Sequence, residues 1–195
     1  MKAAGHGVQV ADTAEAAARA LGSIDATELV GVVHAWAMDA CEAEPDAALL
    51  ASLGVVTSLV QKKSKIRHWF LTQGAQAVTS DEDLSPWQSQ FWGFGRTLQV
   101  EHPEHFGGCI DLDTVRDPDA LIAEIMGDSP DKEVALRRGT RRAARLVRPE
   151  PSMGDHGALE LTAEASYLIT GGAGALGLQV AQYLAKQGAK HLVLT

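Results

Sequence analysis

The sequence lacks the features that mark several specialised classes of protein. Its 195 residues hold two cysteines, Cys41 and Cys109, in no Cys-x-x-Cys pattern, which argues against a disulfide framework and a cysteine-rich zinc site. No uncharged apolar run approaches the ~18 residues of a membrane span, and Met1–Gly7 lacks the apolar core of a signal peptide. With 17 Lys and Arg against 25 Asp and Glu, the net charge of −8 disfavours a nucleic-acid binder. We therefore expect a soluble, cytoplasmic protein with no nucleic-acid or membrane partner.

Metal-binding and hydrolase motifs are also missing. The seven histidines include no His-Glu-x-x-His pattern and no ligand-spaced pair beside a carboxylate cluster. The acids of Asp81–Asp83 precede Ser85 and Pro86 in a predicted turn, where they are expected to face water. Neither Ser89 nor Ser166 has the Gly-x-Ser-x-Gly context of a hydrolase nucleophile. We therefore expect no bound metal and no serine-hydrolase mechanism.

What the sequence does contain is an ordinary globular composition, 46% hydrophobic and 22% charged, arranged as alternating strands and helices. Short β-branched runs that alternate with longer helical stretches are typical of a parallel α/β sheet. The predicted strands are Gly7–Val10, Leu29–Ala35, Ile66–Leu71, Gly108–Leu112, Glu133–Leu136, Arg142–Val147, Ala165–Thr170 and His191–Leu194. The predicted helices follow Asp12, Pro45, Ser85, Asp117 and Gly177, and end near Gly22, Lys62, His102, Gly127 and Gln187.

A change of composition divides the chain. Residues 149–157 have little apolar content and several Pro and Gly residues, so we interpret them as a linker. The linker separates residues 1–148, which hold most of the α/β pattern, from residues 158–195, which form a single βαβ unit.

The βαβ unit carries the one motif with recognisable chemistry. Gly172, Gly174 and Gly177 fit Gly-x-Gly-x-x-Gly directly after a strand and at the start of a helix. Glycines without a Cβ let the backbone approach a pyrophosphate, and a helix N-terminus offers unpaired N–H groups to it. We expect phosphates over Gly172–Leu176, with Gly177 letting the helix pack closely on the strand. The alternative is a glycine-rich turn in an unrelated α/β protein.

Two sets of segments resemble a known family. The loop Thr170–Gly177, with Tyr167–Ile169 before it and His191–Leu194 after it, resembles the cofactor loop of ketoreductase domains in modular (type I) polyketide synthases. Those domains belong to the short-chain dehydrogenase/reductase superfamily. The segments that resemble the family's structural subdomain, a degenerate Rossmann half that braces the catalytic half, are Val32–Asp39, Gln90–Glu104, Gly107–Leu112 and Glu133–Arg137.

The resemblance implies a Rossmann-like structural subdomain over residues 1–148 and the first βαβ unit of a second, catalytic NADP-binding Rossmann subdomain over residues 158–195. It implies reduction, with NADPH, of a β-ketoacyl group to a β-hydroxyacyl group on the phosphopantetheine arm of an acyl carrier protein, with other synthase domains as partners. The cofactor-binding residues that it implies are Thr170, Gly171, Gly172, Ala173, Gly174, Leu176 and Gly177.

No catalytic residue is assigned. The family uses a Tyr and a Lys spaced Tyr-x-x-x-Lys, together with a Ser and an Asn. The only tyrosines here are Tyr167, on the predicted strand before the loop, and Tyr183, which has Lys186 three residues on instead of four. We therefore expect the chain to be a fragment of a longer synthase, truncated in both subdomains, and to be inactive by itself.

Three alternatives stay open. The chain is either part of a reductase or part of a ketoreductase-like module that only scaffolds its neighbours. The third possibility is a different nicotinamide dehydrogenase that shares the loop, but such a protein has no reason to carry the segment Trp92–Pro103.

Six arginines lie within Arg137–Arg148. Their alternation with apolar residues favours a solvated strand face over a phosphate-binding strip or a contact with an acidic carrier protein.

Overall fold

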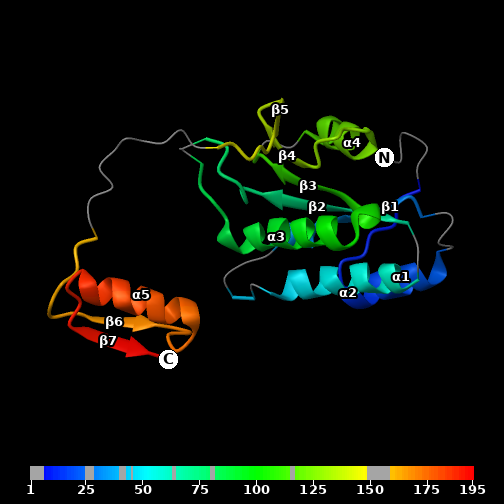
Figure 1. Cartoon of the computed structure of the whole chain (residues 1–195). Coiled ribbons are helices and arrows are strands. Elements are labelled where there is room, and N and C mark those ends of the chain that lie inside the picture. The colour runs from blue at the N-terminus through cyan, green and yellow to red at the C-terminus, as the bar shows by residue number, and fades with distance from the viewer. Residues whose placement is uncertain are drawn as a thin grey trace. The chain divides into compact units, whose positions relative to one another are not determined.

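The computed structural model describes residues 7–24, 29–39, 43–44, 46–62, 65–79, 82–114, 117–148 and 159–195. Its contacts divide the chain into two units, Met1–Leu146 and Val147–Thr195, which are described separately below (Figure 1). The predicted linker, residues 149–157, lies outside the described residues.

The first unit is built on a five-stranded sheet in the order β1–β2–β3–β4–β5. The strands are β1 (Gly31–His34), β2 (Arg67–Gln73), β3 (Phe106–Leu112), β4 (Glu133–Arg137) and β5 (Thr140–Ala143). The first four run parallel, and β5 pairs antiparallel with β4. The predicted α/β class is confirmed, and the predicted hairpin is present, although β5 begins and ends earlier than the Arg142–Val147 expected.

The helices of the first unit are α1 (Ala14–Ser23), α2 (Ala47–Gln61), α3 (Pro86–Glu101) and α4 (Pro118–Met126), with short 3₁₀ helices η2 (Trp36–Asp39) and η3 (Pro103–His105). Asp117 caps α4 as predicted, since its carboxylate accepts from the Ala120 amide at 3.0 Å. Asp12 was the wrong residue for the first cap, because the Thr13 hydroxyl accepts from the Ala16 amide instead.

The predicted strand tail Gly7–Val10 is also wrong. These residues pair with no strand in the described part of the chain. Val10 is 90% exposed, so the apolar run has no sheet face to cover it.

The core fills both faces of the sheet, as expected when a parallel sheet is covered on both sides. Figure 1 shows α2 and α3 on one face and α4 on the other. Successive residues of β2 point to opposite faces, so Phe70 packs in the cluster with Phe91 and Trp92 of α3, while Leu71 packs with Ile125 of α4. This alternation explains why the strands read as continuous apolar runs.

The second unit is a single βαβ unit of β6 (Ser166–Ile169), α5 (Ala175–Lys186) and β7 (His191–Leu194). Its two strands are parallel, with Tyr167 opposite Leu192 and Leu168 opposite Val193. The bounds of β7 are those predicted, whereas α5 begins three residues before the predicted Leu178, because the second half of the glycine motif forms its first turn.

Candidate cofactor-binding site

The glycine loop connects β6 to α5 and turns the chain sharply. Gly171 has φ +67°, in the left-handed region that favours glycine. A Cβ built on Gly172 would lie 2.7 Å from the Ile169 carbonyl oxygen and 2.9 Å from Leu194 Cα. The backbone of the loop therefore lies directly against β7, and a larger residue at position 172 has no room.

Gly177 makes the closest approach in the first turn of α5. A Cβ on this residue would collide with the Gly171 carbonyl oxygen and lie 2.6 Å from Gly172 Cα. The loop itself is thus the neighbour that requires a glycine at position 177, whereas the glycine motif predicted close packing on the preceding strand.

Hydrogen bonds inside the loop decide which amides are left to bind a ligand. The Gly172 amide donates to the Thr195 carbonyl at 2.9 Å, and the Gly174 amide donates to the Gly171 carbonyl at 3.0 Å. The first helical bond runs from the Leu178 amide to the Gly174 carbonyl. Within the described residues, the amides of Ala173, Ala175, Leu176 and Gly177 form no hydrogen bond.

The electrostatics of the loop favour an anion. The N-terminus of α5 carries the positive end of the helix dipole, and no acidic residue lies in its first turn. Ala173 and Ala175 are exposed, and Leu176 is 75% exposed. A helix N-terminus with unpaired amides and a glycine cradle fits the pyrophosphate of a dinucleotide. Gly172 and Gly174 shape the loop but offer no free amide to a ligand, because their N–H groups are already bonded within the unit.

The two tyrosines of the chain lie outside the glycine loop. The Tyr167 hydroxyl accepts from the Thr162 amide at 2.7 Å and donates to the Thr162 carbonyl at 3.3 Å, which closes the turn before β6. Tyr183 lies in α5 and is 53% exposed.

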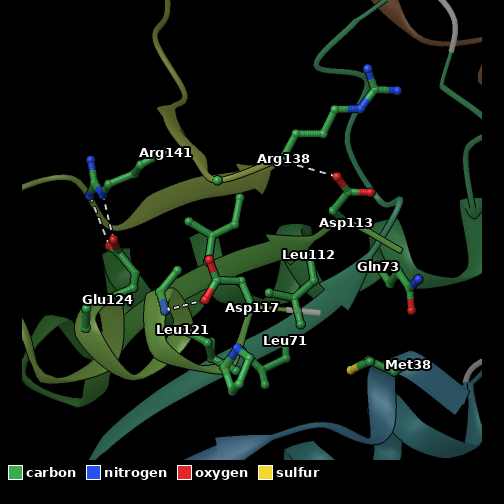
Figure 2. A pocket seen from close by; sticks show the side chains of 15 residues that line it. Met38, Leu71, Gln73, Leu112, Asp113, Asp117, Leu121, Glu124, Arg138 and Arg141 are labelled. Atoms are coloured by element: carbon green, nitrogen blue, oxygen red, sulfur yellow. Dashed lines mark hydrogen bonds and ion pairs between the residues drawn. The ribbon is translucent and has the colours of Figure 1, made fainter. Parts of the chain in front are cut away.

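The first unit contains a separate recess of about 630 Å³ beside the carboxyl ends of β2 and β3 (Figure 2). Leu71, Leu112 and Leu121 supply apolar walls. Figure 2 shows the Arg138 side chain extending away from these apolar walls. Arg141, on the rim, is bonded to Glu124 at 2.6 Å.

Other charged groups around the recess also hold the fold together. The Asp117 carboxylate caps α4, and the Asp113 carboxylate accepts from the Arg138 amide at 3.0 Å. No arrangement of catalytic groups therefore converges on this recess among the described residues.

A buried polar network joins three strands of the first unit, and sequence reasoning missed its centre. Asp111, at the end of β3, is fully buried and receives Arg137 Nη2 at 2.6 Å and the Thr72 hydroxyl at 2.5 Å. The Trp92 indole donates to the same hydroxyl at 3.0 Å. An Asp inside the apolar run Gly-Cys-Ile-Asp-Leu was the available signal, because a buried carboxylate requires partners.

The same network corrects two expectations about charged residues. Glu82 does not face water alone, since Arg137 Nε donates to it at 3.0 Å and this hydrogen bond holds the pKa of Glu82 below its usual value. The clustered arginines are not a uniformly solvated face. The observed ion pairs join Arg137 to Asp111 and Glu82, Arg141 to Glu124 and Asp131, and Arg145 to Asp131.

The part of the chain that the structure describes contains no group of three His, Cys, Asp or Glu side chains placed to hold a metal ion. None of its helices is long and apolar enough to cross a bilayer.

Two family profiles match the chain. Residues 2–146 match "Polyketide synthase extender module SpnB, Rossmann fold domain", and residues 165–195 match "KR domain". The chain belongs to the ketoreductases of modular polyketide synthases. These enzymes are members of the short-chain dehydrogenase/reductase superfamily, as the resemblance of the glycine loop and of the upstream segments implied.

Relatives of this ketoreductase chain are large synthases. It is 37% identical over 174 residues to polyketide synthase GfsA of Streptomyces halstedii, covering 84% of the chain and 2% of the relative. It is 34% identical over 150 residues to the pikromycin synthase component PikAIII of Streptomyces venezuelae, covering 75% of the chain and 10% of the relative. The ketoreductase chain therefore spans a small part of the curated relatives that it matches.

Solved structures agree with this assignment. A C2-type ketoreductase from a modular polyketide synthase matches with a TM-score of 0.68 and 31% identity, over 93% of this chain and 40% of that one. The first ketoreductase of the tylosin synthase matches with a TM-score of 0.70 and 30% identity, over 93% of this chain and 38% of that one. The ketoreductase chain thus spans about two fifths of these solved chains.

Proposed function

We propose that the loop Thr170–Gly177 binds the pyrophosphate of NADPH in a ketoreductase that reduces β-ketoacyl groups to β-hydroxyacyl groups on an acyl carrier protein. The observation that carries the proposal is the set of unbonded amides, from Ala173 and Ala175 to Gly177, that follows β6. Gly172 and Gly177 support it, because they remove the side chains that would hold the loop away from β7 and α5.

The residues of the loop divide the work of binding. The amides of Ala173, Leu176 and Gly177 donate to phosphate oxygens, and the dipole of α5 stabilises their negative charge. Thr170 and Gly171 form the turn that presents these donors. When bound, NADPH supplies the hydride that reduces the ketone carbonyl.

We assign the two parts of the chain different roles. Residues 1–148 form the structural subdomain, whose charged network around Asp111 joins β2, β3 and β4. Residues 158–195 form the start of the catalytic subdomain. Arg138, Arg142 and Arg148 form no ion pair within the described residues and are available to an acidic carrier protein or another synthase domain.

The 195 residues by themselves are proposed to be inactive. Tyr167 is bonded to Thr162, and Tyr183 lacks a lysine four residues later, so neither is placed as the proton donor of the reaction. Reduction then requires a Tyr and a Lys from other residues of the synthase polypeptide. An acyl-thioester ketone incubated with the chain and NADPH should show no consumption of NADPH at 340 nm, whereas turnover would contradict this part of the proposal.

A pair of substitutions at one exposed position tests the pyrophosphate site. Ala173→Glu places a negative charge beside the free amides, and Ala173→Gln adds the same bulk without the charge. Titration of NADPH, followed by amide chemical shifts, should give a dissociation constant at least tenfold weaker for Ala173→Glu than for Ala173→Gln, which should stay within about threefold of the unsubstituted chain. Equal weakening by both variants would show that charge at this position does not matter, and the proposal would fail.

If the chain belongs to a module that only scaffolds its neighbours, the loop is expected not to bind NADPH. A module that only braces its neighbours has no need of free amides, so NADPH should shift none of the loop resonances in any of the three chains. The same titration therefore separates the two functions.

A further inference from the structure

Four histidine rings form a row that runs from the surface of the first unit into its core. His102 follows α3, His105 lies in η3, His68 on β2 and His34 on β1. Ring centroids are 6.1 Å apart for His102 and His105, 6.1 Å for His105 and His68, and 5.2 Å for His68 and His34. The side chain of His102 is 41% exposed, whereas the other three residues are at most 3% exposed. The row thus connects solvent to a buried pair.

A single hydrogen bond joins the inner two rings. His34 Nε2 and His68 Nδ1 are 2.9 Å apart, so one nitrogen donates and the other accepts. His34 also stacks on Phe70, with ring centroids 4.8 Å apart. The second nitrogen of His68, Nε2, is buried and has no hydrogen-bond partner in the described part of the protein. A proton on His68 Nε2 therefore has no acceptor among the described residues.

The charged groups around the pair would not neutralise a positive charge on either inner ring. The carboxylate of Glu104 lies 3.9 Å from His105 Nε2 and 3.7 Å from His102 Nδ1, at the outer end of the row. His105 Nδ1 is engaged with the Ile66 carbonyl at 3.0 Å. No described carboxylate lies within ion-pair distance of either inner ring.

The remaining elements packed on this face add no counter-charge. Helix α2, Ala47–Gln61, contains no titratable side chain. Asp39 of η2 and Arg67 of β2 are exposed and form no ion pair with the inner rings, and Arg96 of α3 is paired with Glu133 at 2.7 Å. A positive charge on either inner histidine would therefore be both buried and unpaired.

The titration of the pair follows from this setting. Burial lowers the pKa of His34 to about 3 and that of His68 to about 4, with the neighbouring histidine adding to each effect. An exposed histidine has a pKa near 6.5. Both rings are neutral in the closed unit and take up protons when exposed, so the stability present above about pH 6.5 is lost as the pH falls.

The position of His34 indicates which part opens first. It is the last residue of β1, a four-residue strand at the edge of the sheet that pairs only with β2 among the described strands. Its ring also contacts Trp36 of η2, with centroids 6.4 Å apart. The inner pair thus joins the edge of the sheet to its centre.

We propose that the His34–His68 pair is an acid-sensitive latch: uptake of two protons separates β1 and η2 from β2, while β2, β3 and β4 stay paired. The latch depends on the geometry of the first unit and not on the cofactor loop. Acid conditions would therefore loosen the structural subdomain at one edge before it unfolds as a whole.

Hydrogen exchange of the 195-residue chain, read by mass spectrometry and corrected for intrinsic rates, tests the latch. Between pH 6.0 and 5.0 the opening constant of residues 31–39 should rise about 50-fold, as two histidines with an open-state pKa near 6.5 require. The opening constant of residues 106–112 should stay smaller than that of residues 31–39 throughout this range, because residues 106–112 are released only when the whole unit unfolds, which exposes the same two histidines and so shares the pH dependence. Equal opening constants in the two segments, or no rise with acid in residues 31–39, would overturn the proposal.

Single substitutions of the inner histidines test how many protons are taken up when residues 31–39 open. His34→Gln and His68→Gln keep a hydrogen-bonding side chain but cannot titrate, so each should reduce the rise to about eightfold. His191→Gln, on β7 in the second unit, is the control and should leave the 50-fold rise unchanged. Should either core variant fail to fold, nitrogen-15 spectra of the histidine rings in the unsubstituted chain decide the question. Both inner rings should remain neutral at pH 5.5, and a folded-state titration near pH 6.5 would contradict the latch.

Discussion

Arg137 Nη2 donates to Asp111 Oδ2 at 2.6 Å, and this ion pair joins the ends of two neighbouring strands, β3 and β4. Asp111 is fully buried and also accepts from the Thr72 hydroxyl and the Ala75 amide. In many nucleotide-binding sheets the carboxyl ends of the strands carry ligand-binding groups. Here the polar groups at that edge bond to one another, which suits the structural role that we propose for residues 1–148.

Removal of the buried carboxylate should be costly. Asp111→Ala leaves Arg137 without one of its partners, so we expect a loss of about 3 kcal/mol in the free energy of unfolding. Urea denaturation followed by tryptophan fluorescence measures this loss. The control is Glu133→Gln, which removes the partner of the exposed Arg96 and should cost less than about 1 kcal/mol. Similar losses in both variants would show that the buried network does not hold the strands together.

Replacement of two glycines in α3 by alanine should change the stability of the first unit in opposite directions. A Cβ on Gly95 would collide with Cys109 Sγ on β3, whereas one on Gly93 meets nothing within 4 Å. Gly95→Ala should destabilise the first unit by about 1–3 kcal/mol through overpacking. Gly93→Ala should stabilise it by about 0.5–1 kcal/mol, because alanine favours the helix. Thermal denaturation of both variants checks the signs, and a stabilised Gly95→Ala would refute the close packing of α3 on β3.

The thiol of Cys109 should be unreactive while the protein is folded. Cys109 is fully buried, and burial raises its pKa to about 12, so the thiolate that reacts with disulfide reagents is scarce across neutral and mildly alkaline pH. In a Cys41→Ser variant, the remaining thiol should react with an aromatic disulfide reagent at pH 8 at least 100-fold more slowly in buffer than in denaturing urea. Equal rates in the two solvents would place Cys109 at an accessible surface.

The elements that local patterns specify were predictable from the sequence. Strand β7 has the predicted bounds, and Asp117 caps α4, because a β-branched run and a cap followed by proline are local signals. The position of the glycine loop between β6 and α5 follows from the same kind of signal. The resemblance to ketoreductases added the identity of the family, which the comparisons confirmed.

Features that depend on partners distant in sequence were not predictable. Glu82 and Arg137 are 55 positions apart, so nothing local indicated that they would pair. The loop amides show the same limit, since the Gly172 amide donates to the carbonyl of Thr195, the residue directly after β7. The glycine motif identified the loop, but only the fold shows which of its donors are free.

An amide-resolved titration of the 195-residue chain with NADPH shows whether the free amides of this loop bind the pyrophosphate of the cofactor. We expect the largest shifts at Ala173, Leu176 and Gly177, and smaller shifts at Gly172 and Gly174, whose protons are already bonded. Saturation should require millimolar NADPH. Millimolar affinity is expected because the loop supplies only part of a binding site. An absence of shifts at Ala173, Leu176 and Gly177, with NADPH present at several millimolar, would show that the loop does not bind the cofactor.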